Sequence, residues 1–186
     1  MPRSFISVEA NEEIRSSLVN VQKELEQTGA DLKIVKPENI HLTLKFLGDI
    51  SESQVDFVKE ALQNATEAVD PFQVQVKGLG VFPEPSFIRV IWAGVSEGEE
   101  QLKSIRKDLD QSLSKISQSS GNKEYIPHYT IARVKSGKAK DKLNSVVENK
   151  SDVKWGSIEA DKVELKKSEL TSEGPIYSTL AAISLS

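Results

Sequence analysis

Apolar residues recur at spacings of three and four in four segments of the 186-residue chain. In the first of them, Ile14, Leu18, Val21 and Leu25 fall on one face, with Asn11 placed to cap the start and Gly29 to end the helix. The same spacing predicts amphipathic helices over residues 12–28, 51–69, 97–116 and 137–148.

The segments between these helices alternate apolar and polar residues, which is typical of strands. In residues 40–47, Leu42, Leu44 and Phe46 fall on one face, opposite His41, Thr43 and Lys45. Residues 117–123 are rich in Ser, Gly and Asn and predict a loop. Strands are predicted over residues 5–8, 40–47, 72–81, 87–95, 129–134 and 177–185, with 32–35 as a short strand or extended segment and 153–170 as one strand or a broken pair.

Strands and helices therefore alternate in a similar order in the two halves of the chain. We infer an α+β fold of two similar lobes whose sheets face a shared cleft. The length suits a single bilobal domain over residues 1–186, and it is sufficient to bury a substantial core.

The composition indicates an ordinary globular protein, with 38% hydrophobic and 28% charged residues. We expect no membrane segment, because no apolar run approaches the roughly 20 residues of a spanning helix, and no signal peptide. The chain has no cysteine, which excludes disulfides and thiolate metal sites and fits a cytoplasmic protein.

A net charge of −4 argues against a protein that binds duplex nucleic acid generally, although it allows a small pocket for the end of a nucleic-acid strand. No apolar heptad or long strand edge is evident, so we expect a monomer.

Both histidines of the chain occur in the same tripeptide pattern, His41-Leu42-Thr43 and His128-Tyr129-Thr130. In a strand, residues two apart share a face, so each imidazole has a threonine hydroxyl beside it. One histidine can remove a proton from a nucleophile while the other donates a proton to a leaving group, and the hydroxyls can bind an anionic oxygen. A single His-x-Thr is usually a surface or core feature. Two copies that use every histidine favour one site for a phosphate.

The stretches RSFISVEA, PENIHLTLKFLGDI and PHYTIARV resemble the 2H phosphoesterase superfamily, and within it most closely the RNA 2′,3′-cyclic phosphodiesterases, also called 2′-5′ RNA ligases. The resemblance spans essentially the whole chain. It implies a bilobal fold with pseudo-twofold symmetry, antiparallel sheets facing a central cleft, helices outside and one motif in each lobe.

The resemblance also implies an activity. RNA ends or nucleotide 2′,3′-cyclic phosphates would be opened at the 3′ oxygen, leaving a 2′-phosphate, and the reverse reaction would be a 2′-5′ ligation. In the family pattern His41 protonates the leaving oxygen and His128 activates water, whereas the residues alone leave the order open. Thr43 and Thr130 would bind the non-bridging oxygens. No cofactor is expected, and two histidines without a third nitrogen or sulfur ligand argue against a metal site.

Other residues near the motifs have more than one interpretation. Arg133 belongs to the family run P-H-x-T-x-A-R and could clamp a phosphate or stack on a base, but simple alternation places it opposite His128 unless a bulge intervenes; the alternative is a surface ion pair. Lys45 shares the His41 face on simple alternation, where it could add positive potential; the preferred interpretation is that it reaches solvent. Packing is the preferred interpretation for three aromatic residues. The alternatives are a border of the nucleoside for Phe5 and base stacking for Phe46, and Tyr129 packs in the core or at the lobe interface. Trp92 and Trp155 receive no role.

Two further functions fit the same motifs. One is a non-catalytic protein that binds RNA ends in the cleft. The other is a 2H enzyme for a small cyclic phosphate, such as one derived from ADP-ribose during tRNA processing. A binding protein would bind RNA ends without turning them over, which distinguishes it from the leading hypothesis. Comparing turnover of an oligonucleotide with turnover of a mononucleotide would distinguish the enzyme for a small cyclic phosphate.

Overall fold

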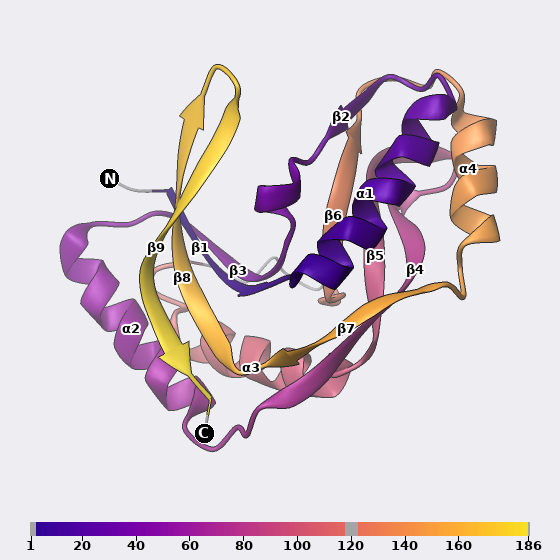
Figure 1. Ribbon diagram of the computed structural model, residues 1–186. Coiled ribbons are helices and arrows are strands. Elements are labelled where there is room, and N and C mark those ends of the chain that lie inside the picture. Colours follow the sequence, from indigo (N-terminus) through magenta and orange to yellow (C-terminus); the bar gives the residue numbers. More distant parts are fainter. Residues whose placement is uncertain (1–2, 118–122, 186) are drawn as a thin grey trace.

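The predicted apolar stripes become the buried faces of four helices in the computed structural model, which describes residues 3–117 and 123–185 (Figure 1). On the first helix, the apolar residues of the predicted stripe are at most 1% exposed. The Asn11 side chain accepts a hydrogen bond from the Ile14 amide, and Gly29 follows the helix with a φ of 80°, a conformation that favours glycine. The helices are α1 (Glu12–Gln27), α2 (Glu52–Thr66), α3 (Glu99–Ser112) and α4 (Lys140–Asn149).

Nine strands in the described part of the chain form one sheet in which every pairing is antiparallel. The order is β7-β4-β5-β6-β3-β1-β8-β9, and β2 also pairs with β6. Region 153–170 is a broken pair, interrupted at Asp161, and most of the predicted loop 117–123 lies outside the described residues. The strands are β1 (Arg3–Glu9), β2 (Leu32–Ile34), β3 (His41–Asp49), β4 (Phe72–Glu84), β5 (Phe87–Glu97), β6 (His128–Val134), β7 (Lys154–Ala160), β8 (Lys162–Thr171) and β9 (Gly174–Ser184).

The sheet has two halves, each covered by two helices (Figure 1). Helices α2 and α3 pack on the half formed by β3, β1, β8 and β9, and α1 and α4 pack on the half formed by β6, β5, β4 and β7. This confirms the α+β fold with two lobes. The lobes do not coincide with the two halves of the chain, however, because α1 and α3 cross between them and β8 and β9 return to complete the sheet beside β1.

A bulge in β3 changes which side chains face the cleft. Leu44 has no partner on β1, so the residues after it lie on the opposite face from the one that strict alternation predicts. The expectations for two residues are therefore wrong. Lys45 is 1% exposed rather than solvent-facing, and Phe46 is 67% exposed rather than packed in the core.

The second motif strand has a bulge at the equivalent place. Ile131, the residue after Thr130, has no partner on β5. As a result Ile131 and Ala132 are both buried, while Arg133 is exposed and lies on the face of His128. Simple alternation placed Arg133 opposite His128 unless a bulge intervened, and the structure contains that bulge.

Within the described residues, no helix has both the length and the apolar character that crossing a membrane requires.

Candidate active site

The two motifs open neighbouring strands, which brings residues 87 positions apart into one region of the sheet. His41 is the first residue of β3 and His128 the first of β6. The middle residues of the motifs, Leu42 and Tyr129, pair with each other and are completely buried. Because side chains alternate along a strand, the two histidines and two threonines project from the opposite face. All four are half-buried.

Each imidazole is held in the same way by the backbone two residues before it. Nδ1 of His41 lies 2.7 Å from the carbonyl oxygen of Asn39, and Nδ1 of His128 lies 2.6 Å from that of Ile126. A carbonyl oxygen only accepts, so each Nδ1 must carry the proton and donate it. Each Nε2 is then the nitrogen that gains or loses a proton, which is the arrangement that acid–base chemistry requires.

Thr43 interacts directly with the first imidazole. Its Oγ1 lies 2.8 Å from Nε2 of His41, so in the neutral ring the hydroxyl donates to Nε2. Thr130 lies on the same face of β6 as His128, in register with Trp92 of β5. The structure therefore places each predicted threonine beside its histidine, as the motif spacing predicts.

Burial lowers the pKa of both histidines below the ordinary value of 6.5, because it disfavours the charged ring. For each ring the hydrogen bond to a carbonyl oxygen opposes this effect, and the Glu9 carboxylate also raises the pKa of His41. Lys166 and His128 lower the pKa of His41, and Arg133 lowers that of His128. The effect of His128 on His41 indicates that the second imidazole is close enough to act electrostatically on the first.

Aromatic residues enclose the first histidine. Phe5 stacks on His41 with ring centroids 4.8 Å apart, and Tyr177 meets the same imidazole edge-on at 5.3 Å. Phe5 is 4% exposed, so it packs as predicted, but it packs against the imidazole. Tyr177 was not predicted to contribute, and its only sequence signal is its position at the start of the last predicted strand.

A second aromatic pair encloses the other histidine. Phe82 meets His128 edge-on at 5.0 Å, and the Trp92 ring lies 5.7 Å away. Gly80, opposite Trp92 on β4, makes room for the indole, because a Cβ there would lie 2.3 Å from its ring. Sequence reasoning left Trp92 without a role and did not single out Phe82. Trp155, by contrast, is buried and donates a hydrogen bond to the carbonyl of Gly78.

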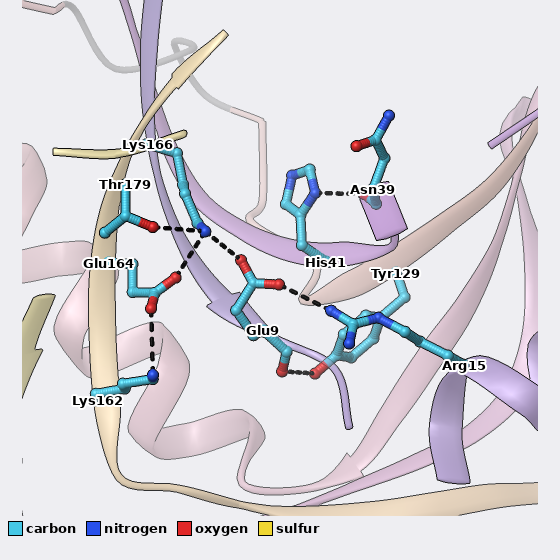
Figure 2. A network of polar contacts seen from close by, with 9 residues as sticks. All are labelled: Glu9, Arg15, Asn39, His41, Tyr129, Lys162, Glu164, Lys166 and Thr179. Atoms are coloured by element: carbon cyan, nitrogen blue, oxygen red, sulfur yellow. Dashed lines mark hydrogen bonds and ion pairs between the residues drawn. The ribbon is translucent and has the colours of Figure 1, made fainter. Parts of the chain in front are cut away.

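A network of ion pairs adjoins His41 (Figure 2). Glu9 pairs with His41 in the register of β1 and β3, and its carboxylate binds Arg15 and Lys166, each at 3.1 Å. Lys166 also contacts Glu164 at 2.9 Å, on the neighbouring strand β8. Charges of both signs thus surround His41, and the effects of Glu9 and Lys166 on its pKa oppose each other.

A second network holds the bulge of β3. The Lys45 ammonium lies 2.6 Å from Asp110 on α3, and Arg106 binds the same carboxylate at 2.9 Å. Arg106 also donates to the carbonyl of Leu44, the bulged residue, at 2.6 Å. The hydroxyl of Tyr125 donates to the carbonyl of Thr43 at 2.8 Å. Because Tyr125 lies three residues before His128, this bond links the segment before the second motif to the first.

Potential metal ligands do not gather in the described part of the chain. No group of three or more His, Cys, Asp or Glu side chains there is arranged to hold a metal ion. The two imidazoles and two hydroxyls lie on one face of the sheet, and Arg133 lies on the same face further along β6.

Comparison with known proteins connects this geometry to a family. A family model described as LigT like Phosphoesterase matches residues 8–92 and 94–177, so each matched stretch contains one motif. The RNA 2′,3′-cyclic phosphodiesterase of Methanothermobacter thermautotrophicus is 36% identical over 183 residues, covering 98% of each chain. That of Aquifex aeolicus is 38% identical over 183 residues, covering 96% of this chain and 94% of its own.

Solved structures share the fold. A crystallised protein of Thermus thermophilus matches with a TM-score of 0.81 and 26% identity, covering 98% of this chain and 97% of its own. The E. coli LigT protein, crystallised with 3′-AMP, matches with a TM-score of 0.71 and 19% identity, covering 99% and 97%. The second likeness concerns the fold alone. Together with the full-length sequence matches, these findings confirm the family that the paired motifs predict: the chain belongs to the LigT-like phosphoesterases.

Proposed function

We propose that this phosphoesterase hydrolyses RNA 2′,3′-cyclic phosphate ends to 2′-phosphomonoesters, using His41 and His128 as its acid–base pair. The observation that carries the proposal is the matched state of the two imidazoles, each with Nδ1 bound to a carbonyl oxygen and Nε2 left to exchange a proton. The names of the relatives from Methanothermobacter and Aquifex support the substrate class.

In the proposed reaction, a neutral histidine accepts a proton from water as the water oxygen bonds to phosphorus. The bond from phosphorus to the 3′ oxygen breaks, and the protonated histidine donates its proton to that oxygen. We assign the acid to His41 and the base to His128. Burial lowers the pKa of both rings, and the largest single charge effect on each ring agrees with this order: Glu9 raises the pKa of His41, against smaller opposing effects of Lys166 and His128, and Arg133 lowers the pKa of His128. The reverse steps would join a cyclic end to a 5′-hydroxyl.

Thr43 and Thr130 are assigned to the non-bridging phosphate oxygens. A hydroxyl donor aimed at developing negative charge contributes about 3 kcal/mol to transition-state stabilisation. Thr43 already donates to Nε2 of His41 at 2.8 Å, so a phosphate oxygen would take over that hydrogen and leave Nε2 free. Arg133 adds positive charge on the same face and is assigned to substrate binding.

The direct test is turnover of a nucleoside 2′,3′-cyclic phosphate in the presence of EDTA. We expect the 2′-monoester as product, identified by phosphorus NMR against both monoester standards, at a rate that the chelator does not change. Appearance of the 3′-monoester would overturn the assigned bond cleavage. Tight binding of the nucleotide without turnover would favour the non-catalytic alternative.

The pH dependence follows from the pKa directions of the two histidines. The reaction needs one ring protonated and one neutral, and both pKa values lie below 6.5 in the free protein. Protonation of the acid is therefore lost as pH rises, so we expect kcat/KM to reach its maximum below pH 6.5 and then to fall towards a tenfold decrease per pH unit. A kcat/KM profile from pH 4.5 to 9 measures this. A maximum above pH 8 would contradict the proposed pair.

A further inference from the structure

Two positive side chains lie directly opposite each other beside the second motif. In the antiparallel pairing of β2 and β6, Lys33 is the register partner of Arg133, and both are exposed (β2 and β6 lie side by side in Figure 1). Register partners share a face of the sheet, with Cβ atoms about 5 Å apart. Like charges in this position repel each other, so the arrangement weakens the sheet unless an anion lies between them.

Protein carboxylates do not neutralise this pair in the described part of the chain. Neither Lys33 nor Arg133 takes part in an ion pair there. Arg133 has the apolar Val90 as its partner on β5. The nearest acidic residues along the chain from Lys33, Asp31 and Glu38, are exposed and form no ion pair either. Both charges are therefore available to a ligand.

The pair belongs to the face of the catalytic motifs. Burial is the main influence on His128 and on Tyr177, lowering the pKa of His128 and raising that of Tyr177. The charge of Arg133 adds to the first effect and opposes the second, so it reaches both residues, although Tyr177 lies on the other half of the sheet against His41. Arg133 lies five positions beyond His128 along β6, so at about 3.3 Å per residue their backbones are at most about 16 Å apart. This separation suits a phosphate other than the one that reacts.

The positive surface continues past the pair. Lys135, two residues beyond Arg133 and just past the end of β6, is also exposed. A net negative chain thus carries three cations, Lys33, Arg133 and Lys135, close together at the end of the second motif strand, and local positive charge of this kind is expected where a single strand is bound.

We propose that Lys33 and Arg133 form a second phosphate site, which binds the phosphodiester next to the cyclic end of an RNA strand. The proposal rests on the proposed function and narrows it to an oligonucleotide substrate. An arginine fork binds two oxygens of one phosphate, and the lysine ammonium adds a point charge. A mononucleotide has no phosphate for this site, so only longer substrates gain from it.

The test compares two substrates, a mononucleoside 2′,3′-cyclic phosphate and a tetranucleotide with the same cyclic end. For Lys33→Gln, we expect kcat/KM on the tetranucleotide to fall by about fivefold to tenfold at low salt, with a salt slope smaller by about 0.7. Turnover of the mononucleotide should stay within twofold of the original protein. The matched control is Lys23→Gln, which removes the same charge from an exposed position on α1.

The outcomes separate the two proposals. Equal losses on both substrates, or none on either, would overturn the second phosphate site and leave the phosphodiesterase intact. Absence of turnover on both substrates by the original protein would overturn the proposed function. Anisotropy of a labelled tetranucleotide carrying a terminal 2′-phosphate then tests the site by itself: weaker binding by Lys33→Gln than by Lys23→Gln supports it, and equal binding refutes it.

Discussion

Replacing His128 by alanine is expected to lower kcat for a nucleoside 2′,3′-cyclic phosphate by about 10²–10⁴-fold, and replacing His41 should have an effect of the same order. Either change removes a proton-transfer group and leaves the other histidine without its counterpart. Neither side chain contributes a large apolar surface to the core, so folding should be retained. Single-turnover rates, with circular dichroism as the check on folding, measure the effect.

Asparagine at position 128 is the sharper control for this prediction. Its amide nitrogen can donate to the carbonyl of Ile126, as Nδ1 of His128 does now, but it cannot take up a proton at neutral pH. If proton transfer is the role, asparagine and alanine should be equally inactive. Activity close to that of the original protein in either variant would contradict the assignment of His128. In the double variant His41→Ala, His128→Ala, kcat should fall by less than the product of the two single decreases, because the two histidines act as a unit.

The sequence predicted the elements and the two motifs well, because both depend on short-range patterns. The apolar stripe of α1 and the His-x-Thr pairs repeat at the periods of a helix and a strand, and these periods persist in the structure. The pattern failed after Leu44, where one unpaired residue reversed the predicted positions of Lys45 and Phe46. Alternation describes a regular strand, and a bulge depends on pairing with another strand, which a single segment does not reveal.

The surroundings of the histidines were less predictable for a related reason. Tyr177 reaches His41 from β9, and Phe82 reaches His128 from β4, and neither strand contains a motif. Their contacts follow from the order of the strands in the sheet. Aromatic residues in strands are usually core residues, so sequence alone does not distinguish a ring that packs on an imidazole from one that packs on leucine.

Replacing Asp110 by alanine is expected to reduce the free energy of unfolding by about 2–3 kcal/mol. The ammonium of Lys45 is bound by this carboxylate at 2.6 Å and is almost fully buried, so the change leaves a buried charge without its partner. Breaking a fully buried ion pair costs about 3–5 kcal/mol, and the loss expected here is smaller because Asp110 is 27% exposed to solvent. Urea unfolding at pH 7 measures the loss. Asp108→Ala, at an exposed site on the same helix without an ion pair in the described structure, should change stability by less than about 0.5 kcal/mol.

Two further measurements test whether the unpaired charge is the cause. Adding Lys45→Met to Asp110→Ala removes the buried charge and should recover part of the lost stability, whereas a simple packing defect would grow with a second substitution. Acid provides the other test. Hydrogen bonds from Lys45 and Arg106 outweigh the effect of burial and hold the pKa of Asp110 below its ordinary value. The stability that the Asp110 carboxylate contributes is therefore fully present above the ordinary carboxyl pKa, and it is lost as the pH falls through the lowered pKa of Asp110. The difference between the original protein and Asp110→Ala should accordingly shrink on acidification; a difference that stays constant down to pH 3 would mean that the ion pair is not its source.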